Sequence, residues 1–191
     1  FWRPAASLTH WLDYRLFPDS FTLMHLHSIL WFAALIVVVT MLYRRFIGAG
    51  WIAGLAGLLY VLDDSGYFPT MWVANRNLLL SLVFGLLAII AHDRWRRQGW
   101  KSGVVLAPLC FLLSLLSGEA GIATFGYVFA YEAVLDRGRW ARRGLVLVPS
   151  LAVIVAWRLL YSLQGYGANG GGFYFDPVRE PLAYALALVR R

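Results

Sequence analysis

Long apolar runs separated by short polar segments dominate the hydropathy pattern of this chain. The clearest run lies within residues 24–45, MHLHSILWFAALIVVVTMLYRR, and ends on two arginines. An apolar helix of about 20 residues crosses the roughly 30 Å hydrocarbon core of a bilayer, and Lys and Arg gather at cytoplasmic helix ends. The pattern therefore predicts a membrane span that runs inward and ends at Arg44 and Arg45.

Further apolar runs follow at intervals, at 46–62, 78–91, 103–117, 122–135 and 145–163. Several are only about 15 residues long, so their polar ends must extend the helices for a full crossing. Ten of the 17 Lys and Arg residues fall in three clusters between these runs. Because positive charge marks the cytoplasmic side, an even number of crossings must separate each pair of clusters. This parity makes residues 118–121 an extracytoplasmic hairpin.

The predicted fold is all-α: a polytopic integral membrane protein with six to seven transmembrane helices whose extracytoplasmic loops carry the polar residues. Residues 1–23 are expected to form an extracytoplasmic loop with an interfacial helix. Six spans occupy 24–163, an extracytoplasmic glycine-rich loop 164–181, and the start of a further span 182–191. The first residue is not Met and the chain stops soon after a new apolar run begins, so we interpret it as a single, partial transmembrane domain.

Composition supports this class of protein. The chain has 191 residues, of which 60% are hydrophobic and 14% charged, and a soluble domain of this length cannot usually bury so much apolar surface. The net charge of +7 does not indicate nucleic-acid binding, because the basic residues form short clusters rather than a stripe with interleaved aromatics. Cys110 is the single cysteine, which excludes an internal disulfide. We expect an integral protein of a bacterial plasma (inner) membrane.

Polar side chains at membrane depth are costly, so each is a functional candidate. The candidates gather on the predicted extracytoplasmic side. Arginines hold phosphate oxygens in bidentate fashion, and a carboxylate can accept a proton from a nucleophile, so this mixed surface suits a lipid with a charged head group. The predicted catalytic residues are Asp13, Asp63, Asp64 and Glu119, and the predicted substrate-binding residues are Arg3, His25, His27, Arg76 and Arg158.

Several candidates have a plainer interpretation. His25 and His27 are two positions apart and do not share a helix face, so the pair alone does not favour a metal site. No other cluster has metal-ligand spacing, and the sequence predicts no metal and no certain cofactor. Asp63 and Asp64 form either a metal or general-base pair or a solvated turn at a helix end.

Two charged candidates stand near the predicted helix ends, where a structural role is also open to them. Arg158 either serves the site or extends to the outer interface. Glu119 either serves the site or caps the next helix. The basic clusters at 94–101 and 137–143 are interpreted as topology determinants only. The pattern Gly50-x-x-x-Gly54 permits close helix contact.

Short motifs along most of the chain resemble one known family, the polyprenyl-phosphate-dependent membrane glycosyltransferases of the C fold. The resemblance is to the protein O-mannosyltransferase-like and tetratricopeptide-containing members. The motifs, in order, are FWRP at 1–4, LDY and LF within 12–17, HLHSIL at 25–30, VANRNLL at 73–79, LLSGEAGI at 115–122 and AWR at 156–158. Ser28 stands where the family has Asn, and Gly118 stands where it has Lys.

The resemblance implies sugar transfer from a polyprenyl-phosphate donor to a protein or glycan acceptor on the extracytoplasmic face, with inversion by direct attack. It implies that an acidic residue upstream of Phe1 is the general base. It also implies that Arg76, Glu119 and Arg158 line the donor phosphate or acceptor site. Because the motifs differ at Ser28 and Gly118, a non-catalytic integral subunit of a larger assembly is the second hypothesis. A transporter is the third, although the sequence lacks a convincing internal repeat.

Overall fold

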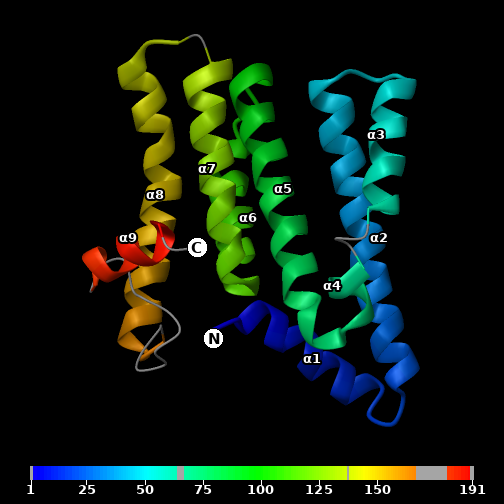
Figure 1. The fold of residues 1–191 in the computed structure, drawn as a ribbon. Coiled ribbons are helices and arrows are strands. Elements are labelled where there is room, and N and C mark those ends of the chain that lie inside the picture. The colour runs from blue at the N-terminus through cyan, green and yellow to red at the C-terminus, as the bar shows by residue number, and fades with distance from the viewer. Residues whose placement is uncertain (1, 64–66, 137, 167–179, 190–191) are drawn as a thin grey trace.

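The computed structural model describes residues 2–63, 67–136, 138–166 and 180–189, and within these ranges every regular element is a helix (Figure 1). The all-α prediction is therefore confirmed. In chain order the elements are α1 (Pro4–Leu16), α2 (Phe21–Phe46), α3 (Trp51–Leu62), α4 (Tyr67–Met71), the 3-10 turn η2 (Val73–Asn75), α5 (Arg76–Gln98), α6 (Gly103–Ser117), the 3-10 turn η3 (Glu119–Ile122), α7 (Ala123–Ala130), the π-helical turn η4 (Tyr131–Leu135), α8 (Trp140–Leu163) and α9 (Pro181–Val189).

Helix α5 is the centre of the bundle. Its apolar residues point in every direction, which is the pattern of a helix surrounded by others. It packs against α2 on one side and against α6 and α7 on the other (Figure 1). Half of its most apolar stretch is buried, against about a quarter for α2 and α8. The position of α5 therefore brings residues from distant parts of the sequence to both of its ends.

Three apolar clusters hold the other helices to α5. Leu35 and Val39 of α2 meet Leu79 and Val83 of α5 in the first cluster. The second joins α5, α6 and α8, and its buried members are Ala88, Phe111, Leu115, Trp157 and Tyr161. The third joins α5, α7 and α8 through Ile89, Val128 and Leu147. Each residue belongs to the apolar run that the sequence assigns to its helix, so the same runs that suit a bilayer also form the helix contacts.

Three helical segments are long and apolar enough to cross a membrane: Phe21–Phe46, Val73–Gln98 and Trp140–Leu163. The apolar helices α3 and α6 are shorter than the roughly 20 residues that a straight crossing needs. The number of long candidates is thus smaller than the six to seven that the sequence predicts. This pattern indicates membrane association.

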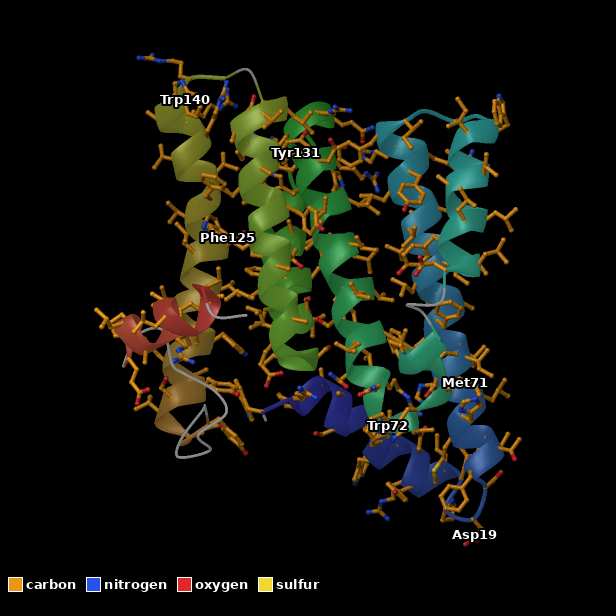
Figure 2. The ribbon with its side chains drawn as sticks, viewed as in Figure 1. Asp19, Met71, Trp72, Phe125, Tyr131 and Trp140 are labelled. Atoms are coloured by element: carbon orange, nitrogen blue, oxygen red, sulfur yellow. The ribbon has the colours of Figure 1, made fainter. Side chains whose placement is uncertain are left out.

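The two ends of the bundle differ in chemistry. The turns that follow α2, α5 and η4 lie together at one end, which we call the basic end because it carries Arg44, Arg45 and the arginines of 94–97 and 139–143. Helix α1, α4 and the turn between α6 and η3 lie toward the opposite end, the α1 end (Figure 1). Aromatic side chains mark both ends, with Trp140 at the first and Trp72 at the second (Figure 2).

Two local features shape the α1 end. Residues 63–77 are the polar segment between the second and third apolar runs, which the sequence predicts as a loop, but α4 and η2 lie within them and α5 begins at Arg76. The chain also reverses between α6 and η3. A Cβ atom on Gly121 would lie 2.7 Å from the backbone carbon of Ser114, a distance that only glycine permits. Gly121 therefore sets how closely η3 returns against α6.

Candidate functional site

A buried ion pair forms the centre of the α1 end. Asp13 of α1 and Arg76, the first residue of α5, are 1% and 0% exposed. An Oδ2 atom of Asp13 lies 2.5 Å from an Nη atom of Arg76. His27 of α2 contacts the other carboxylate oxygen, with Nδ1 2.6 Å from Oδ1. Three helices therefore meet at one carboxylate.

Arg76 is also surrounded by acceptors from α1 and α2. Its Nε donates to the Ser28 hydroxyl at 2.9 Å, and its second Nη donates to the Met24 carbonyl at 2.7 Å. The Thr9 hydroxyl accepts a longer bond of 3.4 Å. Because a buried guanidinium is costly without such partners, this full set of contacts makes Arg76 a fixed part of the scaffold that positions its neighbours.

The hydrogen bonds of His27 define its tautomer. The indole N–H of Trp31 donates to His27 Nε2 at 3.0 Å, so Nε2 is the acceptor and Nδ1 carries the proton that is donated to Asp13. Burial, followed by the charge of Arg76, lowers the pKa of the nearby His10. Burial at the α1 end thus favours the neutral form of His10 near this paired carboxylate.

We call Asp13, His27 and Arg76 the triad. A second and more exposed pair lies beside it. Arg3, the residue before α1, donates from Nε and Nη2 to one oxygen of Glu119 at 3.0 and 2.9 Å. The two side chains are 30% and 28% exposed. The Tyr161 hydroxyl donates to the other Glu119 oxygen at 3.3 Å, and the Arg158 guanidinium lies 6.0 Å from the centre of the Tyr161 ring. We call Arg3, Glu119, Arg158 and Tyr161 the outer group.

Asn77 connects the buried pair of Asp13 and Arg76 to the outer group. We orient its amide so that its oxygen accepts from Arg3 Nη1 at 3.1 Å and its nitrogen donates to the Ala74 carbonyl at 3.1 Å, because the opposite orientation would set donor against donor. Asn77 directly follows Arg76 in α5. The position of Arg3 is therefore linked to the same helix start that holds Asp13.

The structure brings together six of the nine predicted site residues, namely Arg3, Asp13, His27, Arg76, Glu119 and Arg158, although Arg76 and Asp13 are too buried to meet a ligand directly. His25 lies on α2 but takes no part in the hydrogen bonds of the triad. Asp63 is the exposed residue that ends α3. Asp64 lies outside the described residues.

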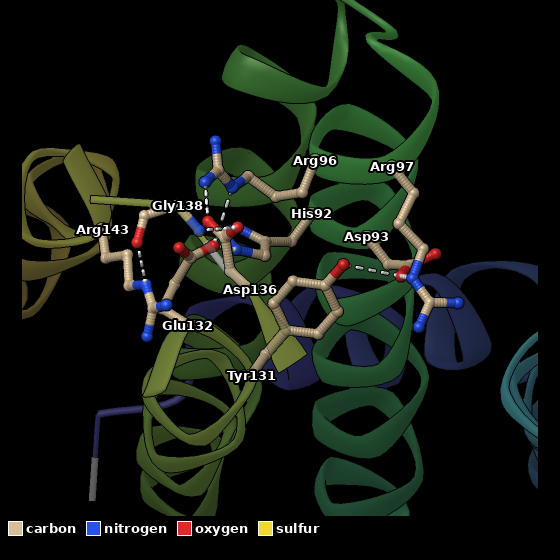
Figure 3. Close-up of polar contacts among 9 residues, drawn as sticks. All are labelled: His92, Asp93, Arg96, Arg97, Tyr131, Glu132, Asp136, Gly138 and Arg143. Atoms are coloured by element: carbon tan, nitrogen blue, oxygen red, sulfur yellow. Dashed lines mark hydrogen bonds and ion pairs between the residues drawn. The ribbon is translucent and has the colours of Figure 1, made fainter. Parts of the chain in front are cut away.

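A second polar cluster, which was not predicted from the sequence, occupies the basic end. Glu132 of η4 is 1% exposed. One of its oxygens accepts from Arg96 Nε at 2.9 Å and lies 2.8 Å from His92 Nε2 (Figure 3). Arg96 also pairs with Asp136. Burial opposes ionisation of Asp136, but hydrogen bonds from the Gly138 N–H and from Arg96 hold the pKa of its carboxyl below the ordinary value.

The other part of this cluster surrounds Asp93, which is 0% exposed. The Tyr131 hydroxyl donates to Asp93 Oδ1 at 2.8 Å, and Arg97 Nε lies 3.1 Å from the same oxygen (Figure 3). Arg45 pairs with the other oxygen. Arg143 in addition donates to the Gly138 carbonyl at 2.8 Å.

The interpretation of 94–101 and 137–143 as topology determinants only is therefore wrong. Arg96 pairs with Glu132 and Asp136 and so joins α5 to η4 and the following turn. Arg97 pairs with Asp93 within α5, and Arg143 of α8 donates to the Gly138 carbonyl. One signal in the sequence could have revealed this end: Glu132 is a charged residue within the apolar run 122–135, and such a residue needs a partner.

Comparison of this chain with protein families, with curated proteins and with solved structures finds no match. The site is therefore interpreted from its own geometry and from the sequence motifs.

Proposed function

We propose that this chain is the membrane-embedded part of a glycosyltransferase-like protein that takes a sugar from a polyprenyl-phosphate donor. One observation carries the proposal. The motifs of the family resemblance are spread along the sequence, and they meet at one end of the bundle. Arg3 and Glu119 are 116 positions apart and share a two-donor ion pair, while Asp13 and Arg76 form a buried one beside it.

The burial of these residues divides their proposed roles. Asp13 and Arg76 are nearly inaccessible, whereas the His27 side chain is 27% exposed, so the buried pair positions the last turn of α1 against the start of α5. The three charged residues of the outer group, Arg3, Glu119 and Arg158, are partly accessible, and Tyr161 is buried beside them. Arginine side chains match phosphate oxygens in charge and geometry. In the proposal, Arg158 and Arg3 bind the donor phosphate, and Glu119 keeps Arg3 in place until the phosphate arrives.

The orientation follows from the two ends. We propose that the basic end faces the cytoplasm of a bacterial plasma membrane and that the α1 end faces outward. The shorter helices α3, α6 and α7 with η4 run alongside the three long candidates (Figure 1), so we propose that they also cross, which gives six spans. The acceptor, a protein or a glycan, then reaches the site from the extracytoplasmic side.

The test is binding of undecaprenyl phosphate to the full-length protein, measured by native mass spectrometry. We compare wild type with Arg158→Gln and, as a control of equal charge change, with Arg142→Gln, which lies at the basic end. A hydrogen bond to a charged group contributes roughly 1.5–3 kcal/mol, so Arg158→Gln is expected to weaken binding about 10-fold or more, while Arg142→Gln binds as wild type. Equal binding by all three proteins would contradict the donor site.

A specific observation favours the second candidate, a non-catalytic subunit. The close contact that the pattern Gly50-x-x-x-Gly54 permits is not made within the described part of the chain. A Cβ atom on Gly57 would lie 2.9 Å from Thr40 Oγ1, but Cβ atoms on Gly50 and Gly54 would meet nothing within 4 Å. The face of α3 that carries Gly50 and Gly54 could thus receive a helix of another subunit.

Size-exclusion chromatography in mild detergent tests this candidate. A Gly54→Leu variant is expected to release a partner helix without unfolding the chain, since the side chain enters open space. A wild-type protein that already elutes as a monomer would contradict the subunit role.

A further inference from the structure

A hollow of about 370 Å³ lies between α2 and α5 at the basic end, on the opposite end of the bundle from the proposed donor site. Its lining residues come from the last turns of both helices: Met41, Arg44, Arg45, Ile90, Arg94 and Gln98. Helices α2 and α5 both run toward this end, so each contributes the residues of its own C-terminal part.

The hollow has an excess of positive charge. The buried carboxylate of Asp93 is already bound by Arg45, Arg97 and the Tyr131 hydroxyl. Within the described part of the chain, neither Arg44 nor Arg94 forms an ion pair with a carboxylate, and both are exposed. The two guanidinium groups therefore present donors that an anion can use.

The polar and apolar residues of the hollow are separated by depth. Met41 lies three positions before Arg44, and Ile90 lies four positions before Arg94. At 1.5 Å per residue these apolar side chains are about 5 Å further from the helix ends than the arginines. The guanidinium of Arg94 also lies 4.4 Å from the centre of the Trp100 ring, and this cation–π contact favours a defined position for it at the rim.

We infer that this hollow binds the head group of an anionic glycerophospholipid. Basic pockets between helices on the cytoplasmic side are suited to such head groups. The arginines face the phosphate, and Met41 and Ile90 contact the upper part of the acyl chains. A soluble phosphate or a phosphorylated peptide would leave this apolar wall uncovered. The inference rests on the membrane orientation proposed above but not on glycosyl transfer.

Native mass spectrometry of the full-length protein in mild detergent tests the inference, with phosphatidylglycerol and phosphatidylcholine as probes. The test variant is Arg44→Gln with Arg94→Gln. The matched control is Arg139→Gln with Arg142→Gln, which removes the same charge from exposed positions at the start of α8. An arginine near a lipid head group contributes roughly 1 kcal/mol, about fivefold in affinity, so the test variant should bind phosphatidylglycerol about 30-fold more weakly.

Support requires that wild type prefers phosphatidylglycerol over phosphatidylcholine and that the control stays within about threefold of wild type. Equal losses in the test and control variants would overturn the site in favour of general charge attraction. Displacement of phosphatidylglycerol by inorganic phosphate would overturn the lipid as occupant. Because the probe lipid carries no isoprenoid chain, this result is separate from the undecaprenyl phosphate experiment at Arg158. A wild-type protein that binds undecaprenyl phosphate but not phosphatidylglycerol would reject this inference alone.

Discussion

The two ends of α5 bury charges of opposite sign, a cation at the α1 end and an anion at the basic end. At the α1 end a cation, Arg76, is the most buried charge, although it stands at the helix N-terminus where the macrodipole favours anions. At the basic end an anion, Asp93, is fully buried near the helix C-terminus, where the macrodipole favours cations. Each end therefore buries a charge of the unfavourable sign and neutralises it with partners from other helices.

The partners of these two charges differ in their accessibility. Arg76 is enclosed by Asp13, His27 and Ser28, so the interior of the α1 end is closed. Asp93 is covered from outside by arginines, and Arg97 remains 50% exposed. At the α1 end the partly exposed Arg3 is balanced by the carboxylate of Glu119. The basic end instead has more arginines than carboxylates near its surface, and so keeps a surplus of positive charge. We expect phosphate groups to bind at both ends, to Arg3 and Arg158 at the α1 end and to Arg44 and Arg94 at the basic end.

The largest expected effect tests the closed interior. Replacing Arg76 by Leu leaves the carboxylate of Asp13 buried without its cation, and loss of one partner of a buried pair costs about 3–5 kcal/mol. We expect a large fall in the free energy of unfolding, measured by denaturant titration of the purified protein in detergent. The double variant Asp13→Leu with Arg76→Leu should recover most of this loss. A double variant as unstable as the single one would show that the pair is not the cause.

A smaller loss is expected at the basic end. Glu132→Leu removes the acceptor of His92 and Arg96, but Arg96 keeps Asp136. Unsatisfied buried groups cost about 1–3 kcal/mol, so the same titration should give a loss of this size. Glu132→Gln, which keeps an acceptor oxygen, should retain part of the stability. If Glu132→Leu were as damaging as Arg76→Leu, the basic end would be as closed as the α1 end.

The outer group should separate stability from function. The pair of Arg3 with Glu119 is nearly one-third exposed, so Arg3→Gln should cost at most about 1 kcal/mol of stability. The same variant should weaken undecaprenyl phosphate binding markedly, as is expected for Arg158→Gln. Normal lipid binding together with a large loss of stability would make Arg3 a structural residue like Arg76.

The smallest expected effect is a pH dependence at the α1 end. Burial and the charge of Arg76 lower the pKa of His10 below its ordinary value of 6.5. As the pH falls through 6.5, the unfolded chain therefore binds a proton before the folded chain does, and the folded state loses stability. In His10→Gln this part of the loss should disappear, which a comparison of unfolding midpoints at pH 7.5 and at about pH 5.5 would detect. An unchanged pH slope in His10→Gln would contradict the burial of this imidazole.

Much of the α1 end could be predicted from the sequence, because its residues belong to short motifs beside apolar runs. The sequence indicates that Arg3, Arg76 and Glu119 share a side of the membrane, but it does not show which of them is accessible. Arg76 and Arg3 look alike in sequence, and only the packing of α1 and α2 around the start of α5 encloses one of them. The basic end could not be predicted in the same way, since its arginines are fully explained by charge bias until the buried Glu132 and Asp93 are seen beside them.

The sequence by itself determined that the chain is all-α, that its helices are apolar enough for membrane association, and where its positive charge gathers, because these properties depend on local hydropathy and on residue order. Only the tertiary structure decided which charges are paired. The pairing of Asp13 with Arg76 and of Glu132 with Arg96 depends on distances between helices that are far apart in sequence. The same packing decided that α5 is the common support of both polar clusters, since burial and Coulomb interactions act through space rather than along the chain.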